Sequence, residues 1–197
     1  MRYTLACILI LASHWCFAVT TDDIAACTVC HGINLQGNLA TEAPAIAGME
    51  FWYIKAQLGA FRAGLRGTHK QDFSGMEMQP QAVILDDDMV APISQFISNL
   101  PTQKLTSAPI GDQTKGRALY QACAACHGIT GEGNEALGAP SLNGQNDWYL
   151  EAQLIKFQEG VRGQTVQGQQ MRAAVGRLNS VEDVRDIVTY INTLENH

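Results

Sequence analysis

The sequence lacks an excess of basic residues. It holds 13 Lys and Arg against 19 Asp and Glu, which gives a formal net charge of −6. Domains that bind nucleic acid usually present a basic patch or stripe, so we expect no nucleic-acid partner. An acidic surface instead favours protein partners that carry a basic docking patch.

Long hydrophobic runs are scarce as well. The compact apolar run at residues 5–12 follows Arg2 and leads toward the small residue Ala18. This arrangement is typical of a secretory signal peptide, and the run falls short of the about 20 apolar residues that span a bilayer. We interpret residues 1–18 as a signal peptide, with an uncleaved N-terminal anchor as the alternative. No second run follows, so we expect a periplasmic mature chain without a transmembrane span.

Cysteines are few, and four of the six form a pattern. Two lie within the predicted signal peptide, and the others form two C-x-x-C pairs, each followed directly by histidine. The two groups are Cys27, Cys30 and His31, and Cys123, Cys126 and His127. Residues three and four apart share one face of a helix, so the thiols and the imidazole of each group point the same way. C-x-x-C-H is the attachment signature of c-type haem, in which the thiols bond the vinyl groups and the histidine is the proximal iron ligand.

Three other kinds of site use C-x-x-C pairs. A structural zinc site could combine two pairs, but it needs no histidine after each, and an offset of 96 residues is too large for one site. A thioredoxin-like redox pair belongs in a βαβ context, which the sequence does not show. Disulfides are common in exported proteins and stay as an alternative. The pattern favours haem attachment, with two covalently bound haem c groups.

The haem motifs belong to an internal repeat with the same offset of 96 residues. The matched segments include Ala43-Pro44 with Ala139-Pro140, Trp52-Tyr53 with Trp148-Tyr149, Ala56-Gln57-Leu58 with Ala152-Gln153-Leu154, and Arg66-Gly67 with Arg162-Gly163. Such self-similarity indicates a duplicated domain. The stretch between the copies is rich in Pro, Thr, Ser and Gly and is typical of a linker. We predict domain 1 at residues 19–100, the linker at 101–111 and domain 2 at 112–197.

No strong strand pattern is present, so the sequence predicts an all-α fold with three helices in each domain. The first helix carries the haem motif, and in domain 1 it is shortened because only residues 20–26 precede Cys27. The last helix begins after Asp86 in domain 1 and after Ser180 in domain 2, and both residues are suitable N-caps. The middle helices show apolar stripes at helical spacing. These stripes are Ile54, Leu58, Phe61 and Leu65, and Leu150, Leu154, Phe157 and Val161.

Each iron needs a second axial ligand, and methionine in the loop before the last helix is the candidate. Met171 is the only methionine of domain 2 and lies seven residues before Leu178. Met78 lies seven residues before Leu85, which makes it the register-matched ligand in preference to Met76. The alternative is that these methionines only fill the core. A thioether ligand raises the reduction potential and occupies the sixth position, which favours an electron carrier over an oxygen-activating enzyme.

Repeated polar and aromatic residues are candidates for contacts with the haem propionates. A planar guanidinium suits a carboxylate, and the indole and phenol groups can donate hydrogen bonds, although such rings can also serve only as core. The candidates are Arg66, Arg162, Trp52, Tyr53, Trp148 and Tyr149. Pro44 and Pro140 each lie 13 residues after the motif histidine. A backbone carbonyl there could accept the second N–H of the imidazole.

In these features the chain resembles the cytochrome c4 family. The resemblance rests on the two C-x-x-C-H motifs, both prolines, the repeated W-Y-x-x-A-Q-L segments and the methionine before each last helix, and it covers almost all of the mature sequence. It implies two tandem class I cytochrome c domains related by a pseudo-twofold axis, with haem edges facing each other. It also implies that His and Met ligate each iron and that the proline carbonyl orients the histidine.

The same resemblance implies a periplasmic electron donor or relay. The expected partners are redox proteins, namely an oxidase, a reductase or a dehydrogenase, with any membrane association made through such a partner. The cytochrome subunit of flavocytochrome c sulfide dehydrogenase is similar in build and is an alternative. A small dihaem redox enzyme is a further alternative, but it would need an open or displaceable iron site.

Overall fold

The computed structural model describes residues 19–103 and 110–194. The predicted signal peptide, residues 1–18, and residues 104–109 of the predicted linker lie outside the described residues. No helix in the described ranges is long and apolar enough to cross a membrane.

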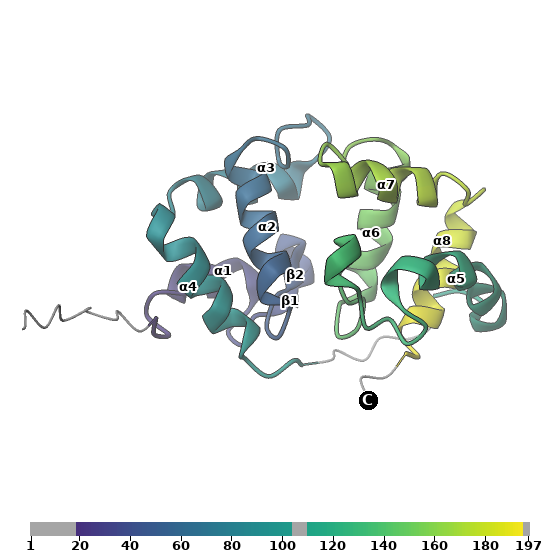
Figure 1. Ribbon diagram of the computed structural model, residues 1–197, viewed down its shortest axis with the longest axis horizontal. Helices are drawn as coiled ribbons and strands as arrows, with labels where there is room; N and C mark the ends of the chain where they lie inside the picture. The colour runs from purple at the N-terminus through teal and green to yellow at the C-terminus, as the bar shows by residue number, and fades with distance from the viewer. Residues whose placement is uncertain (1–18, 104–109, 195–197) are drawn as a thin grey trace, which may run out of the picture.

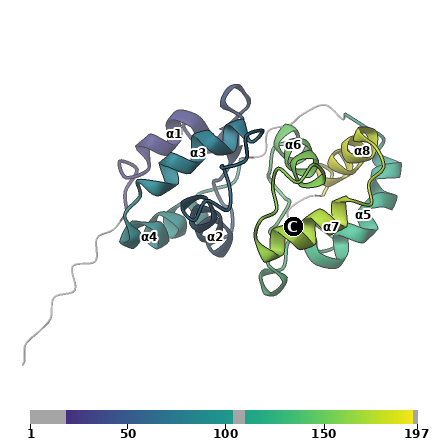
Figure 2. The same cartoon turned by 90° about the horizontal axis from the view of Figure 1, so that it is seen from above.

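The described residues form two similar helical domains that lie side by side (Figures 1 and 2). In both views α2 and α6 lie at the boundary between them, and an approximate twofold axis runs between these two helices. The helices of domain 1 are α1 (Ala25–His31), α2 (Phe51–Arg62), α3 (Phe73–Val83) and α4 (Asp87–Ser98). Those of domain 2 are α5 (Gln113–His127), α6 (Asp147–Gln158), α7 (Val166–Val175) and α8 (Val181–Ile191).

The helical class is confirmed, but the predicted loop before each last helix is wrong. That segment forms α3 in domain 1 and α7 in domain 2. Each helix begins at a side chain that accepts a backbone N–H of the first turn. Asp72 accepts from the N–H of Gly75, and the Thr165 hydroxyl accepts from the N–H of Gly168. Such N-caps satisfy N–H groups that have no partner inside the helix, and so they favour a helix where composition suggests a loop.

A second difference from the predicted fold is a small hairpin after α1. Its antiparallel strands are β1 (Gln36–Asn38) and β2 (Ala43–Ala45), and one short helical turn, η1 (Leu39–Thr41), joins them. Domain 2 has a single bridge at the matching place, between Asn134 and Ala139, with the turn η2 (Glu135–Leu137). Three residues are too few to show an alternating pattern in the sequence. In both domains this turn carries the proline back toward the haem motif.

The apolar stripes of the middle helices lie in the core, with one exception. From α2, Ile54, Leu58 and Phe61 are buried against α4, and the matching residues of α6 are buried against α8. Each such side chain stabilises the fold by about 1.5–3 kcal/mol. Leu65 is the exception: it lies beyond the end of α2 and is 41% exposed, whereas Val161 at the matching position of domain 2 is buried.

The first helices differ in length, as predicted. Helix α1 has 7 residues, whereas α5 has 15 and packs along α8. The extra turns place Tyr120 in the core, where its ring lies 5.3 Å from that of Tyr190 and its hydroxyl donates to the Gly128 carbonyl. Domain 1 has the smaller Ile24 at the matching position, and it is also buried.

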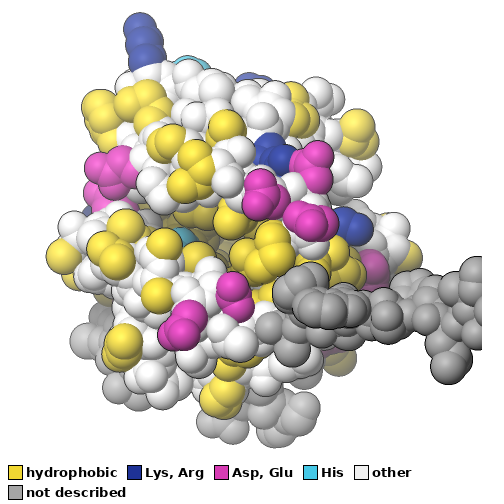
Figure 3. Space-filling view, turned by 90° about the vertical axis from the view of Figure 1, so that its left-hand side faces the viewer, with side chains coloured by type: hydrophobic (Ala, Val, Ile, Leu, Met, Phe, Trp, Pro, Cys, Tyr) yellow, Lys and Arg dark blue, Asp and Glu magenta, His cyan; other side chains and the backbone are white. Residues whose placement is uncertain are grey.

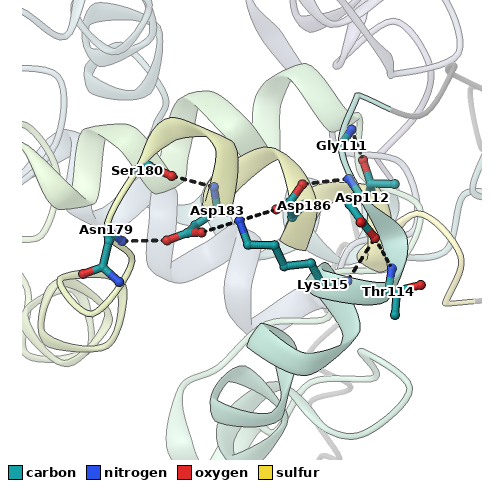
Figure 4. A network of polar contacts seen from close by, with 9 residues as sticks. Gly111, Asp112, Thr114, Lys115, Asn179, Ser180, Asp183 and Asp186 are labelled. Atoms are coloured by element: carbon teal, nitrogen blue, oxygen red, sulfur yellow. Dashed lines mark hydrogen bonds and ion pairs between the residues drawn. The ribbon is translucent and has the colours of Figure 1, made fainter.

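A network of polar contacts holds the start of α5 to α8 (Figure 4). The ammonium of Lys115 lies 2.9 Å from a carboxylate oxygen of Asp183 and 2.9 Å from one of Asp186. Asp186 also accepts from the backbone N–H of Asp112. The hydrogen bond from Lys115 lowers the pKa of Asp183. Burial acts to raise the pKa of Asp186, but the bonds from Asp112 and Lys115 outweigh it, so that pKa is also lowered.

This network predicts that acid weakens domain 2. A carboxyl group whose pKa is lowered by folding contributes stability above its unfolded pKa of about 3.9, and the contribution is lost as pH falls through the folded value. We expect Lys115→Met to reduce the free energy of unfolding at neutral pH, by an amount that shrinks below about pH 4. Urea unfolding across this pH range measures the difference. A difference that stays constant down to about pH 3 would contradict the proposed linkage.

Candidate functional site

Each domain places its C-x-x-C-H motif in the last turns of the first helix. Helix α1 ends at His31 and α5 ends at His127, and both histidines are 7% exposed. Cys27 and Cys123 pack against their domain cores, whereas the second cysteine of each pair is exposed. Burial raises the pKa of Cys27, and it raises the pKa of Cys123 to about 11.

The alternatives for these motifs do not fit the described residues. No disulfide joins the two cysteines of either motif, which leaves all four sulfur atoms for another bond. No group of three or more His, Cys, Asp or Glu side chains in the described ranges could hold a metal ion, which removes the geometry that a structural zinc site needs.

The two histidines make the same hydrogen bond. Nδ1 of His31 donates to the Pro44 carbonyl at 2.8 Å, and Nδ1 of His127 donates to the Pro140 carbonyl at 2.8 Å. A carbonyl only accepts, so the proton must lie on Nδ1, and the lone pair of Nε2 is left for a metal. Burial lowers the pKa of both histidines, which keeps the rings neutral at neutral pH. The structure thus gives each prolyl carbonyl the orienting position that the resemblance implies.

The methionine candidates lie on α3 and α7 and not in loops. Met78 and Met171 are partly buried and pack against the cores of their domains. Met76, by contrast, is 40% exposed. In Figure 3 the domain 1 end of the molecule is hollowed, and the hollow has a hydrophobic floor. Of the two methionines of α3, the packing therefore favours Met78 for an interior role.

The repeated arginines and tyrosines meet at the boundary between the domains. Arg162 of domain 2 donates to the Tyr53 hydroxyl at 2.9 Å and to Gln57 at 3.1 Å, both in domain 1. Arg162 also donates to Gln153, and Arg66 donates to Gln57. Sequence reasoning missed the two glutamines as site residues, although the repeated A-Q-L segment holds both. The boundary thus combines matching residues of α2 and α6 with both repeated arginines.

This boundary has an excess of positive charge. Arg162 is 8% exposed, and burial together with Arg162 lowers the pKa of Arg66. The buried Nε of Arg66 has no hydrogen-bond partner among the described residues. Two buried guanidinium groups with an unused donor are costly unless an anion compensates them. The site therefore calls for a carboxylate-bearing ligand.

The repeated aromatic pairs lie beside this boundary. The rings of Trp52 and Tyr53 are 5.5 Å apart, and those of Trp148 and Tyr149 are 6.0 Å apart, both edge to face. Trp148 and Tyr149 line a cavity of about 150 Å³, together with Glu42 of domain 1. Trp148 and Tyr149 thus share a cavity with a residue of domain 1, which a role only in the core of domain 2 would not require.

A buried ion pair also crosses the boundary. The Lys156 ammonium lies 2.6 Å from the Asp72 carboxylate and 2.9 Å from the Ser74 hydroxyl. The side chains of Lys156 and Asp72 are 15% and 4% exposed. Because Asp72 is the N-cap of α3, this pair connects domain 2 directly to the helix that carries Met78.

Comparisons with known proteins agree with two such centres. The family model described as "Cytochrome c" matches residues 22–101 and again residues 113–195. Cytochrome c4 of Stutzerimonas stutzeri is 30% identical, and the match covers 87% of this chain and 85% of that protein. The "Thiosulfate dehydrogenase electron acceptor" of Stutzerimonas stutzeri (strain A1501) is 31% identical over 70% of this chain and 65% of its own length. The crystal structure of reduced recombinant cytochrome c4 from Pseudomonas stutzeri has a TM-score of 0.74 at 26% identity, and covers 89% of this chain and 96% of that chain.

Two cytochrome c domains with one C-x-x-C-H motif each mean two covalently bound haem c groups. The residues present fit this group. The thiols, the free Nε2 atoms and the hydrophobic hollow suit a porphyrin with an iron centre. The unpaired Nε and the buried arginines suit its two propionate carboxylates.

The buried ion pair gives a prediction for the boundary. Lys156→Met leaves the Asp72 carboxylate buried without its cation, and we expect it to reduce the free energy of unfolding by about 3–5 kcal/mol. The matched control is Arg185→Met, which breaks the more exposed pair with Glu151 and should cost about 0–1 kcal/mol. Urea unfolding of the holoprotein measures both. Equal effects of the two substitutions would show that the pair with Asp72 has no special role at the boundary.

Proposed function

The chain belongs to the cytochrome c family, as a dihaem member of the cytochrome c4 group, and we propose that it is a periplasmic carrier of single electrons between a redox donor and a terminal oxidase or another reductase. The observation that carries this proposal is the duplicated centre, in which each histidine Nδ1 is bonded to a prolyl carbonyl and each domain offers a packed methionine. Haem iron supplies reversible one-electron exchange between its ferrous and ferric states.

In this proposal His31 and Met78 would bind one haem iron, and His127 and Met171 would bind the other. The hydrogen bond to proline fixes the ring plane and the tautomer of each histidine. A thioether ligand would favour the reduced state of the iron and would leave no open position for a substrate. Cys27, Cys30, Cys123 and Cys126 hold the porphyrins covalently, so the carrier cannot lose them when it moves between partners.

The arginines at the boundary are proposed to face the propionates. Arg66 and Arg162 are positioned there by hydrogen bonds to glutamine side chains. Tyr53 and Tyr149 add hydroxyl groups beside them, and Tyr53 already accepts from Arg162. Positive charge near a haem disfavours its ferric form, so this cluster would act on both potentials.

The partners are proposed to be redox proteins. The relative named as an electron acceptor of thiosulfate dehydrogenase supports a dehydrogenase as one class of donor. A subunit bound permanently in a flavocytochrome c sulfide dehydrogenase-like complex is the alternative. Copurification of the chain from its source separates the two, because a free carrier elutes at the mass of the chain and a subunit elutes with a flavoprotein.

The ligand assignment gives one prediction. Met78→Ala and Met171→Ala should each remove about half of the methionine-to-iron charge-transfer absorption of the oxidised protein, since each removes one of two equivalent ligands. The matched control is Met76→Ala, on the same helix as Met78, which should leave the band intact. If Met76→Ala removes the band and Met78→Ala does not, the ligand of domain 1 is misassigned.

The proposed carrier function gives a further prediction. Reductive titration of the holoprotein should consume two electron equivalents per chain, because each iron accepts one electron. The reduced protein should then be stable against peroxide on the time scale of mixing, since both sixth positions are filled. Catalytic turnover with peroxide or thiosulfate, together with a high-spin haem, would instead establish a dihaem enzyme.

A further inference from the structure

In each domain, the loop that follows the haem motif is hydrogen-bonded by a side chain of the other domain. In domain 1, Gln145 accepts from the backbone N–H of Ala45 at 3.1 Å and donates to the Ala45 carbonyl at 2.9 Å. In domain 2, the Glu50 carboxylate accepts from the backbone N–H of Ser141 at 2.6 Å. The two bonded N–H groups lie at matching positions of the repeat, whereas the side chains that bind them do not: Glu50 matches Asn146, and Gln145 matches Met49.

The bonded N–H groups belong to the peptide units that orient the proximal histidines. The N–H of Ser141 and the carbonyl of Pro140 form one peptide unit, and that carbonyl accepts from Nδ1 of His127. A continuous chain of two hydrogen bonds thus runs from Glu50, through the peptide, to His127. The same chain in domain 1 runs from Gln145, through the peptide between Pro44 and Ala45, to His31.

The two series of hydrogen bonds differ in the charge of the side chain at their end. In domain 1 the terminal acceptor is the neutral amide of Gln145, and the neighbouring Asn146 donates to the Gln36 carbonyl at 3.0 Å. In domain 2 the terminal acceptor is a carboxylate. None of the ion pairs among the described residues involves Glu50, so no cation neutralises it directly.

A carboxylate at the end of such a chain has a definite effect. Hydrogen bonds in series polarise one another, so the negative charge strengthens the acceptor power of the Pro140 carbonyl. A stronger bond from Nδ1 makes the imidazole a more basic ligand, as partners of ligating histidines do in other metal sites. A more basic ligand and a nearby negative charge both favour ferric over ferrous iron.

We propose that Glu50, a residue of domain 1, is a positioning and tuning residue for the haem of domain 2, and that it lowers the reduction potential of that haem. The inference rests on the proposed function, because it requires His127 to be an iron ligand. It makes the contact between the domains the source of an asymmetry between two centres that otherwise match. When the protein holds one electron, Glu50 would therefore shift that electron from the domain 2 haem toward the domain 1 haem.

The test is a redox titration of the Glu50→Gln holoprotein in which each haem is followed separately by its haem methyl NMR signals. Met171→Ala identifies the signals of the domain 2 haem. Glutamine retains an oxygen that can accept from Ser141 and removes only the charge. We expect the ferric-to-ferrous equilibrium of the domain 2 haem to shift about three- to tenfold toward ferrous, which is about 30–60 mV, since tenfold is 59 mV for one electron. The domain 1 haem should shift less.

Two variants control for charge. Glu182→Gln removes an exposed carboxylate of domain 2, on α8, and should leave both potentials close to those of the wild type. Glu50→Asp keeps the charge and should retain most of the wild-type potential. An unchanged domain 2 potential in Glu50→Gln, or equal shifts of both haems, would overturn the proposal. So would a shift in Glu50→Asp as large as that in Glu50→Gln.

A measurement on the wild-type protein tests the proposal even if the Glu50→Gln variant fails to fold. In the reduced holoprotein, the Nδ1 proton of His127 should resonate downfield of that of His31, because its hydrogen bond is the stronger. Coincident signals or the reverse order would contradict the inference. The same samples separate it from the proposed function: absence of histidine and methionine ligation in the wild type defeats both, whereas normal ligation without the Glu50 effect defeats only the tuning.

Discussion

The hydrogen bond from a histidine Nδ1 to a prolyl carbonyl is the constraint on which the two centres depend. It occurs in both domains with the same length of 2.8 Å. It fixes the tautomer, so that only Nε2 can bind iron, and it needs the turn after the first helix to carry the proline back beside the motif. In domain 1 the strands on both sides of this turn contact α1, and the backbone N–H of Gly48 just beyond them donates to the Ile97 carbonyl of α4.

The boundary between the domains is the second constraint. It brings Arg66 and Arg162 together, and it leaves the Nε of Arg66 without a partner in the described part of the chain. Tyr53, Tyr149 and Asp72 favour the charged form of Arg162, whereas burial and the charge of Arg162 act against that of Arg66. Domain docking thus places the buried arginines where the proposed propionate contacts would form, and it also places side chains of each domain on the loop that orients the histidine of the other.

Much of this arrangement could be predicted from the sequence, because it depends on the spacing between residues that are close together in the chain. The C-x-x-C-H motifs, the duplicated segments and the apolar stripes identify the helical class, the cofactor and the middle helices. Local spacing failed at α3 and α7, where the caps at Asp72 and Thr165 start helices in segments of loop-like composition. It also placed Leu65 in the core, although Leu65 lies beyond the end of α2 and is exposed. Contacts such as Lys156 with Asp72 or Glu50 with Ser141 join residues far apart in the chain, and no periodicity encodes them.

Electron transfer by this chain, as proposed, requires two haems that are each held by a histidine and a methionine. Near-infrared magnetic circular dichroism of the oxidised wild-type protein, with haem content measured on the same sample, tests this most directly. The account predicts two haems per chain and a single low-spin class with histidine–methionine ligation. A high-spin signal, or a bis-histidine band from either haem, would contradict it.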